Sequence, residues 1–243
     1  LKDNGITPIS VDGIDRWPVQ RYIAMMPFRM TGNEYIISLR DGKASMGDET
    51  GRQAVEFLQE IGQYFNEGFG ATDYATAQSM FLDGKSAMYY IGDWEQAAML
   101  EAYNAGKVDY FYLPTAEGAK TGANEFCVNS GIGMAFNTQT FDAKTKDFIK
   151  YVIENYGKIY AGRMQMSPIK TELPEDIQFT DLYLRIREDM EKTGENFLKP
   201  WDTYLDVDTN TVMQDNMLLL AAGDMTVDDF IKIVDDAIAS NVK

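Results

Sequence analysis

The stretch from Phe81 to Glu95 constrains the fold of this chain more than any other. Its centre is rich in small, β-branched and aromatic side chains, which favours a short buried strand. Gly84 can end a preceding helix, because glycine readily takes the positive φ of a helix C-terminus. Gly92 breaks the strand, and Asp93 can cap a following helix through its side-chain oxygen. The stretch therefore predicts a helix, a strand and a second helix in succession.

The same kind of periodicity predicts the remaining elements. We expect strands over residues 5–11, 85–91, 108–113 and 126–136, helices over residues 18–30, 51–69, 73–82, 94–104, 144–164, 175–192 and 210–222, and loops over residues 39–47 and 201–204. Thr226 and Asp229 have the spacing of a capping box for a last helix. Because strands and helices alternate along the first half, we predict an α/β fold with a mostly parallel sheet flanked by helices.

Composition excludes several classes of function. The net charge of −16 argues against binding to nucleic acid and against binding to an anionic membrane surface. No apolar run is long enough to cross a bilayer. Cys127 is the single cysteine and histidine is absent, which argues against an internal disulfide, a structural zinc site and a histidine-dependent catalytic triad. We predict no cofactor and no metal.

The chain has three tryptophans, and each lies at a predicted element boundary beside a charged residue. They occur as Arg16-Trp17, Asp93-Trp94-Glu95 and Trp201-Asp202. An indole face can stack on the C–H groups of a sugar ring, while neighbouring charged groups bind the sugar hydroxyls. The alternative is that all three anchor loops to the core, and the residues alone leave both possibilities open.

Other motifs are weaker. Gly131-Ile132-Gly133 has two glycines of a dinucleotide fingerprint but lacks the third and is followed by a strand pattern. The acidic residues of two loops lack the spacing of a calcium loop, and we expect them to be solvated; they are Asp12, Asp15, Asp206 and Asp208. Asp93 and Glu95 could serve a carboxylate-based glycoside hydrolase, which remains an alternative.

Several motifs together resemble a known family. Residues 51–58, Phe81-Leu-Asp-Gly-Lys-Ser-Ala-Met, Gly92-Asp-Trp and Tyr112-Leu-Pro are similar to segments of the extracellular solute-binding proteins of bacterial ABC importers, in their carbohydrate-binding, maltose-binding-protein-like branch. The resemblance extends over essentially the whole chain. It implies two α/β lobes joined by crossing segments, with the ligand held between them.

The resemblance also implies a domain arrangement and a function. Residues 1–114 and 169–243 would form most of the second lobe, and residues 115–168 would be an excursion into a partial first lobe, most of which would precede Leu1. The protein would be a non-enzymatic component that captures a sugar or oligosaccharide outside the cell, as a periplasmic or lipid-anchored protein, and delivers it to a membrane permease. A solute-binding protein for a non-sugar ligand and a scaffold without ligand are the alternatives.

The resemblance finally implies site residues. Trp94 would be the stacking aromatic of the second lobe, with Trp201 as a second stacking aromatic and Trp17 as a further cleft aromatic. The hydrogen-bonding candidates are Asp93, Glu95, Arg16 and Glu125. We expect the apolar faces of residues 126–164 to lack their usual partner, and therefore to pack differently, to pair with another chain or to be loosely held.

Overall fold

The computed structural model describes residues 1–115, 117–129, 133–193 and 197–241. Within these residues the chain forms two compact units. Unit 1 comprises residues Leu1–Ile91, Phe111–Val128 and Thr193–Lys243, and unit 2 comprises Gly92–Tyr110 and Asn129–Lys192. These boundaries differ from those of the predicted segments 1–114, 115–168 and 169–243, and the assignment of those segments to two lobes stays a prediction.

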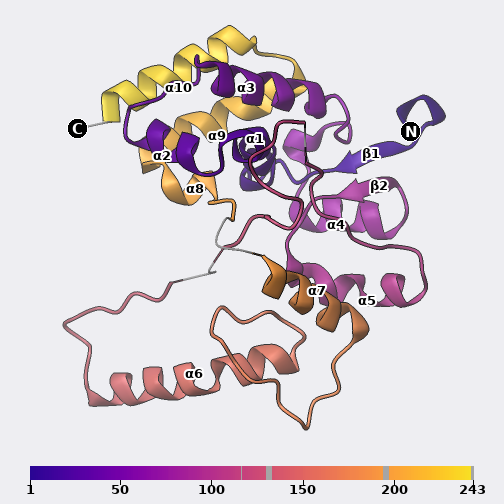
Figure 1. Cartoon of the computed structure of the whole chain (residues 1–243), viewed down its shortest axis with the longest axis vertical. Coiled ribbons are helices and arrows are strands. Elements are labelled where there is room, and N and C mark those ends of the chain that lie inside the picture. The colour runs from indigo at the N-terminus through magenta and orange to yellow at the C-terminus, as the bar shows by residue number, and fades with distance from the viewer. Residues whose placement is uncertain (116, 130–132, 194–196, 242–243) are drawn as a thin grey trace. The chain divides into compact units, whose positions relative to one another are not determined.

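Unit 1 combines a small sheet with helices (Figure 1). It contains β1 (Thr7–Ser10), α1 (Trp17–Thr31), α2 (Glu34–Arg40), α3 (Glu49–Gly62), α4 (Tyr74–Leu82), β2 (Ser86–Tyr89), α8 (Trp201–Tyr204), α9 (Val207–Ala222) and α10 (Val227–Asn241), with short 3₁₀ turns at Lys2–Asn4 and Phe69–Ala71. Strands β1 and β2 pair in parallel, with Thr7 opposite Ser86 and Ile9 opposite Met88. The predicted α/β class and parallel pairing are therefore confirmed.

Unit 2 is helical in the part that the structure describes. It contains the 3₁₀ turn η3 (Asp93–Glu95), α5 (Gln96–Asn104), α6 (Ala143–Gly162) and α7 (Asp181–Lys192). Helices α5 and α7 pack together. Arg185 of α7 pairs with Asp109 at 2.7 Å, and the Tyr110 hydroxyl donates to Asp189 at 2.7 Å. None of the described helices of either unit is long and apolar enough to cross a membrane.

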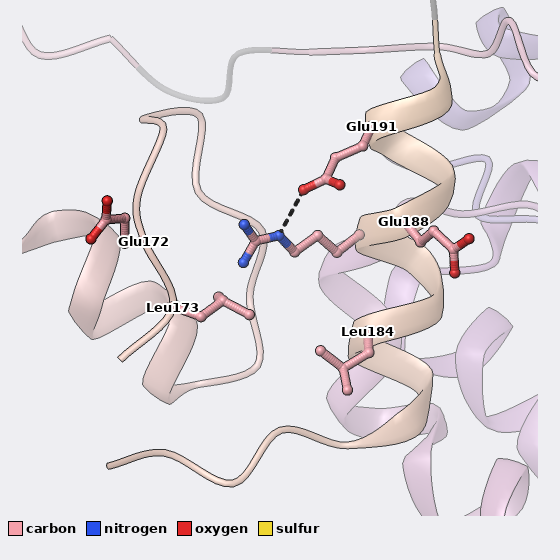
Figure 2. Close-up of a pocket in the computed structure, with 6 residues that line it drawn as sticks. Glu172, Leu173, Leu184, Glu188 and Glu191 are labelled. Atoms are coloured by element: carbon pink, nitrogen blue, oxygen red, sulfur yellow. Dashed lines mark hydrogen bonds and ion pairs between the residues drawn. The ribbon is translucent and has the colours of Figure 1, made fainter. Parts of the chain in front are cut away.

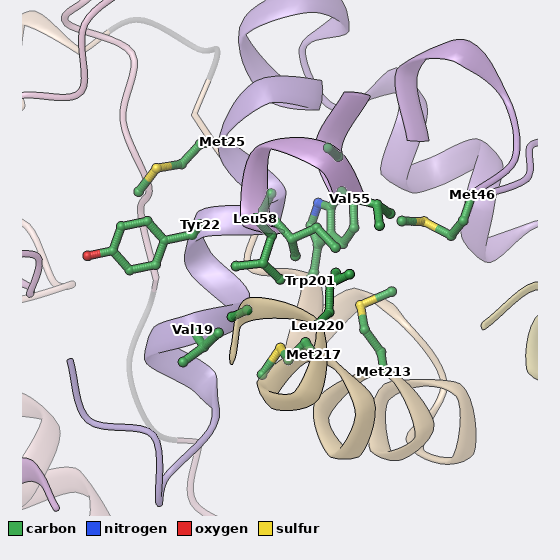
Figure 3. Packing of buried hydrophobic residues seen from close by; sticks show 14 of the residues in the cluster. Val19, Tyr22, Met25, Met46, Val55, Leu58, Trp201, Met213, Met217 and Leu220 are labelled. Atoms are coloured by element: carbon green, nitrogen blue, oxygen red, sulfur yellow. The ribbon is translucent and has the colours of Figure 1, made fainter. Parts of the chain in front are cut away.

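The hydrophobic core lies in unit 1, between α1, α3, α9 and α10 (Figure 3). On α3, the predicted face residues Ala54 and Leu58 are fully buried, and Phe57 and Ile61 are partly buried against the core. Methionines fill much of the space opposite it, where their unbranched side chains can adapt to an irregular gap. The labelled core residues in Figure 3 are Val19, Tyr22, Met25, Met46, Val55, Leu58, Trp201, Met213, Met217 and Leu220.

Local signals set several helix ends. Pro18 lies in the first turn of α1, where its missing N–H has no intrahelical partner to lose. The backbone N–H of Asp229 donates to Thr226 Oγ1 at 3.1 Å, and that hydroxyl donates to Asp229 Oδ2 at 2.6 Å. This is the predicted capping contact at the start of α10. Asp73 likewise caps α4 by accepting from the Thr76 N–H at 2.8 Å.

Two predicted strands are not formed. Residues 108–113 are irregular, because the Leu113 carbonyl accepts from the Arg29 guanidinium at 2.6 Å and the Tyr112 ring stacks on Phe126 in place of a strand partner. The predicted strand 126–136 is reduced to one bridge, between Cys127 and Leu198, in its described part. Ser130, Gly131 and Ile132 lie outside the described residues, and so does that part of the glycine motif.

Helix boundaries also differ from the predictions. The helix predicted over residues 51–69 ends at Gly62, where the chain packs so closely on Ala221 of α9 that a Cβ atom would overlap the backbone. Helix α7 begins at Asp181 instead of residue 175. Helix α2 extends into the predicted loop 39–47. Residues 201–204 form a short helix instead of the predicted loop. Asp93 does not cap a helix, since neither η3 nor α5 has a side-chain cap.

Candidate functional site

The most prominent candidate is the turn that carries Trp94 in unit 2. The Trp94 side chain is 44% exposed, and its ring lies against the backbone of Gly92. The Trp94 carbonyl accepts a hydrogen bond from Gln165 Nε2 at 3.1 Å. An exposed indole that rests on Gly92, in a turn whose backbone is held by Gln165, is a surface on which an apolar ring face can stack.

Polar side chains accompany the indole in sequence. Asp93 is half-buried, and burial raises the pKa of its carboxyl group. Glu95 and Gln96 are more deeply placed, with 7% and 5% exposure. The Gln96 side-chain amide has no hydrogen-bond partner among the described residues. Asp93 is therefore the more accessible of the two predicted acids, and Glu95 is largely buried.

A second candidate turn joins β1 to α1 in unit 1. Arg16 has a positive φ of 64°, which is uncommon for a residue with a side chain, and its exposed guanidinium pairs with Asp215 of α9. Trp17 is half-buried, and the Arg21 guanidinium lies 5.4 Å from the centre of its ring. This turn therefore presents a partly covered indole beside a cation, a cation–π arrangement.

An ion pair behind Trp17 was not predicted. Arg21 Nη1 donates to Asp202 Oδ1 at 2.7 Å, and Arg21 Nη2 donates to Asp202 Oδ2 at 3.2 Å. Arg21 is only 7% exposed, so this bidentate pair is well shielded. The only signals in the sequence are that Arg21 follows Trp17 by one helical turn and that Asp202 follows Trp201. Neither signal indicates which acid a given arginine meets across the fold.

Trp201 is not a surface residue in this structure, which corrects its prediction as a stacking aromatic. It is 1% exposed, and its ring centre lies 6.2 Å from that of Tyr35 (Figure 3). The adjacent Asp202 reaches Arg21 while the indole fills the core. The charged neighbour Asp202 therefore does not indicate that the Trp201 indole is exposed, because successive side chains of a helix point in different directions.

Glu125 is engaged within its own turn. Its carboxylate accepts from the Gly122 N–H, and its backbone carbonyl accepts from Arg29 Nη1 at 2.8 Å. Arg29 is 1% exposed and also binds the Gly122 and Leu113 carbonyls at 2.6 Å each. Glu125 therefore helps to shape the segment 113–125.

Asp12 was expected to be solvated, and the structure corrects this. It is 1% exposed at the end of β1, its Oδ1 accepts from the Asp15 N–H at 3.1 Å, and its Oδ2 has no partner among the described residues. Burial raises the pKa of Asp12 from 3.8 to about 6. Asp206 is also more than a solvated acid, because it caps α9 by accepting from the Thr209 N–H.

Neither of two depressions in the surface of unit 2 is lined by a predicted site residue. One, of about 470 Å³, lies between α7 and the segment before it, where Leu173 and Leu184 face each other beside the Arg187–Glu191 pair (Figure 2). The other, of about 570 Å³, lies where α5 ends, near Lys107 and Asp181. Among the described residues, no group of three or more Cys, Asp or Glu side chains is placed to hold a metal.

The architecture defines the class of protein. Two solved chains have the same fold: a chitin oligosaccharide binding protein, with a TM-score of 0.78 and 20% identity, and a protein from a study of xylan utilization in Caldanaerobius polysaccharolyticus, with a TM-score of 0.77 and 22% identity. The matches cover 98% and 97% of this chain and 62% of each solved chain. The fold is therefore that of a solute-binding protein.

The family model for bacterial extracellular solute-binding proteins matches residues 8–182, and the chain belongs to this family. An uncharacterized ABC transporter extracellular-binding protein of Pyrococcus horikoshii is 26% identical over 118 residues, which cover 49% of this chain and 27% of that protein. A probable sugar-binding periplasmic protein of Brucella suis is 25% identical over 124 residues, which cover 50% of this chain and 29% of that protein. The match thus spans less than a third of either curated relative.

Proposed function

We propose that this chain belongs to the substrate-binding component of a bacterial ABC importer and that it binds a sugar or oligosaccharide. The observation that carries the proposal is the Trp94 indole, 44% exposed and supported by Gly92, in a member of a solute-binding family. The names of the relatives and solved neighbours support carbohydrate as the ligand class. Trp94 stacks on the sugar ring, and Asp93 accepts from its hydroxyls.

In unit 1, taken by itself, we propose that the turn of Arg16 and Trp17 is a second sugar-contacting surface. Trp17 is half-buried, so part of the residue is exposed, and the Arg21 guanidinium lies over its ring. Glu95 and Glu125 contribute by stabilising the conformation of their turns and do not contact the sugar directly. Glu95 is 7% exposed, and the Glu125 carboxylate accepts from the Gly122 N–H. Trp201 is left out of the ligand set because it is 1% exposed.

The test is calorimetric titration of this chain with xylo-, chito- and manno-oligosaccharides and with galactose. Trp94→Ala should weaken binding of the recognised sugar by at least about tenfold, since removing the ring removes the stacking surface. Phe111→Ala is the matched control, because Phe111 is an exposed aromatic with 70% exposure that lies outside every proposed contact surface. Equal losses in both variants, or no binding by the parent chain, would contradict the proposal.

We further propose that the protein binds the sugar without hydrolysing it and passes it to a membrane permease. Asp93 and Glu95 flank Trp94 in a single turn, and the burial of Glu95 leaves this turn without the open pair of acids that a glycosidase uses. Incubation with chromogenic glycosides should release no chromophore. Release that is lost in Asp93→Asn would instead support the hydrolase.

The location and self-association are also proposals. The family points to the outside of the cell, as a periplasmic or lipid-anchored protein. Several large apolar side chains of unit 2 are exposed, and we propose that they pair with a second copy of the chain; they are Met134, Phe136, Phe148, Tyr151, Ile153 and Ile159. Sedimentation should show a dimer that Phe148→Ser with Tyr151→Ser converts to a monomer.

A further inference from the structure

Gly92 is required by the ring of Trp94 and not by its own backbone. Its φ of −91° and ψ of 171° are extended values that any residue adopts. A Cβ atom at this position would overlap three carbons of the Trp94 ring, Cζ3, Cε3 and Cη2. The six-membered ring of the indole therefore rests directly on the Gly92 backbone, and any larger residue would displace it.

Gln165 holds the same turn from a distant part of the sequence. Its Nε2 donates to the Trp94 carbonyl at 3.1 Å, across 71 positions of the sequence. The end of α6 places Gln165, because its backbone N–H donates to the Tyr160 carbonyl at 2.9 Å and Met164 takes a positive φ of 55°. The backbone of the Trp94 turn is thus tied to the end of α6.

We infer that Gly92 and Gln165 are positioning residues, which hold the Trp94 indole in its ligand-stacking orientation before a sugar arrives. This inference rests on the proposed function. An exposed large side chain normally samples several rotamers, and binding must then immobilise it at a cost in affinity. A ring that already rests on Gly92, in a turn fixed by Gln165, avoids most of that cost. Loss of either residue should weaken sugar binding about two- to tenfold without removing the indole.

The experiment uses the full chain labelled with 5-fluorotryptophan and observed by ¹⁹F NMR. The chain has three tryptophans, which should give separate resonances, and Trp94→Phe should identify that of Trp94. The variants are Gly92→Ala and Gln165→Ala. The matched controls are Gly70→Ala, where a Cβ atom would meet nothing within 4 Å, and Gln139→Ala, in another exposed loop. The resonance of the buried Trp201 reports whether each variant is folded.

We expect the Trp94 resonance of Gly92→Ala and Gln165→Ala to narrow and to move toward that of free fluorotryptophan. The dissociation constant for the recognised sugar should rise in both variants and in neither control. A parent chain that binds no sugar overturns the proposed function itself. If the parent binds sugar, an unchanged Trp94 resonance in both variants overturns the positioning role alone. A shifted resonance with an unchanged dissociation constant also overturns that role.

Discussion

Asp12 is a carboxyl group that the folded protein holds in an unfavourable environment. It is 1% exposed, one of its oxygens has no partner among the described residues, and its pKa is raised to about 6. In the unfolded chain the same group titrates near pH 4. Because the folded state binds the proton more tightly, the contribution of Asp12 to stability is fully present below pH 4. It is lost as the pH rises through about 6.

Asp12→Asn should therefore raise the free energy of unfolding at pH 7 by about 2 kcal/mol and leave it nearly unchanged at pH 4. The asparagine oxygen can still accept from the Asp15 N–H, so the turn is retained. Urea unfolding at both pH values measures the effect. Asp3→Asn is the control, because Asp3 is exposed. The same fall in stability between pH 4 and pH 7 in parent and variant would refute the prediction.

Two residues of the same type with similar sequence neighbours can lie in different environments. Trp94 and Trp201 both adjoin an aspartate, yet one indole is 44% exposed and the other 1%. What separates them is packing: Trp201 meets Tyr35, while Trp94 rests on Gly92. The sequence could thus predict candidate aromatics, but it could not decide which of them faces solvent. The pairing of Arg21 with Asp202 also escaped prediction, since 181 positions separate its partners.

At the scale of elements, the C-terminal part of α1 organises a long irregular segment. Arg29 donates to the Leu113, Gly122 and Glu125 carbonyls and to Thr121 Oγ1. The Arg29 carbonyl in turn accepts from the Lys120 N–H at 2.8 Å. A buried guanidinium thus satisfies backbone acceptors that have no strand or helix to serve them.

Arg29→Met should lower the free energy of unfolding by about 3 kcal/mol, because it removes a buried guanidinium that serves three partly buried carbonyls. Amide hydrogen exchange of the described residues between 113 and 125 should speed up more than that of α9. Arg163→Met, at an exposed arginine, is the matched control and should change neither property. Equal exchange in the parent and in Arg29→Met would contradict the role of Arg29.

Elements with strong local signals were predicted well. Strands β1 and β2, the Pro18 start of α1 and the Thr226 cap of α10 all depend on neighbouring residues. The predicted strand 108–113 had the right apolar pattern but found no partner strand. Its Leu113 carbonyl accepts a hydrogen bond from the Arg29 guanidinium, which is 84 positions away in the sequence. A strand needs a neighbour to receive its hydrogen bonds, and a sequence pattern does not supply one.

At the scale of the whole molecule, the two units differ in their internal packing. Nearly all buried apolar side chains belong to unit 1. In the described part of unit 2, only Ala161, Leu182 and Tyr183 are buried apolar residues. The apolar stripe of α6 was predicted from the sequence, but Ile153 and Ile159 are 53% and 49% exposed. A periodic pattern predicts the helix, and the surroundings decide whether its face is covered.

Unit 2 should therefore open more easily than unit 1. We expect amide protection in α5, α6 and α7 to be at least about tenfold lower than in α1, α3 and α9, since few buried contacts oppose local opening. Hydrogen exchange read by mass spectrometry checks this in one experiment on the full chain. Equal protection in both sets of helices would show that unit 2 is stabilised by contacts other than apolar burial.

The core of unit 1 joins early and late parts of the sequence. Helices α1 and α3 both pack against α9, and α3 also packs against α10, so Val19 and Leu58 share one core with Met217 and Val234. A ribosome synthesises the first pair long before the second. The nascent chain therefore cannot close this core until α9 and α10 have emerged. Until then the apolar faces of α1 and α3 lack their cover, so we expect this core to stay open during synthesis.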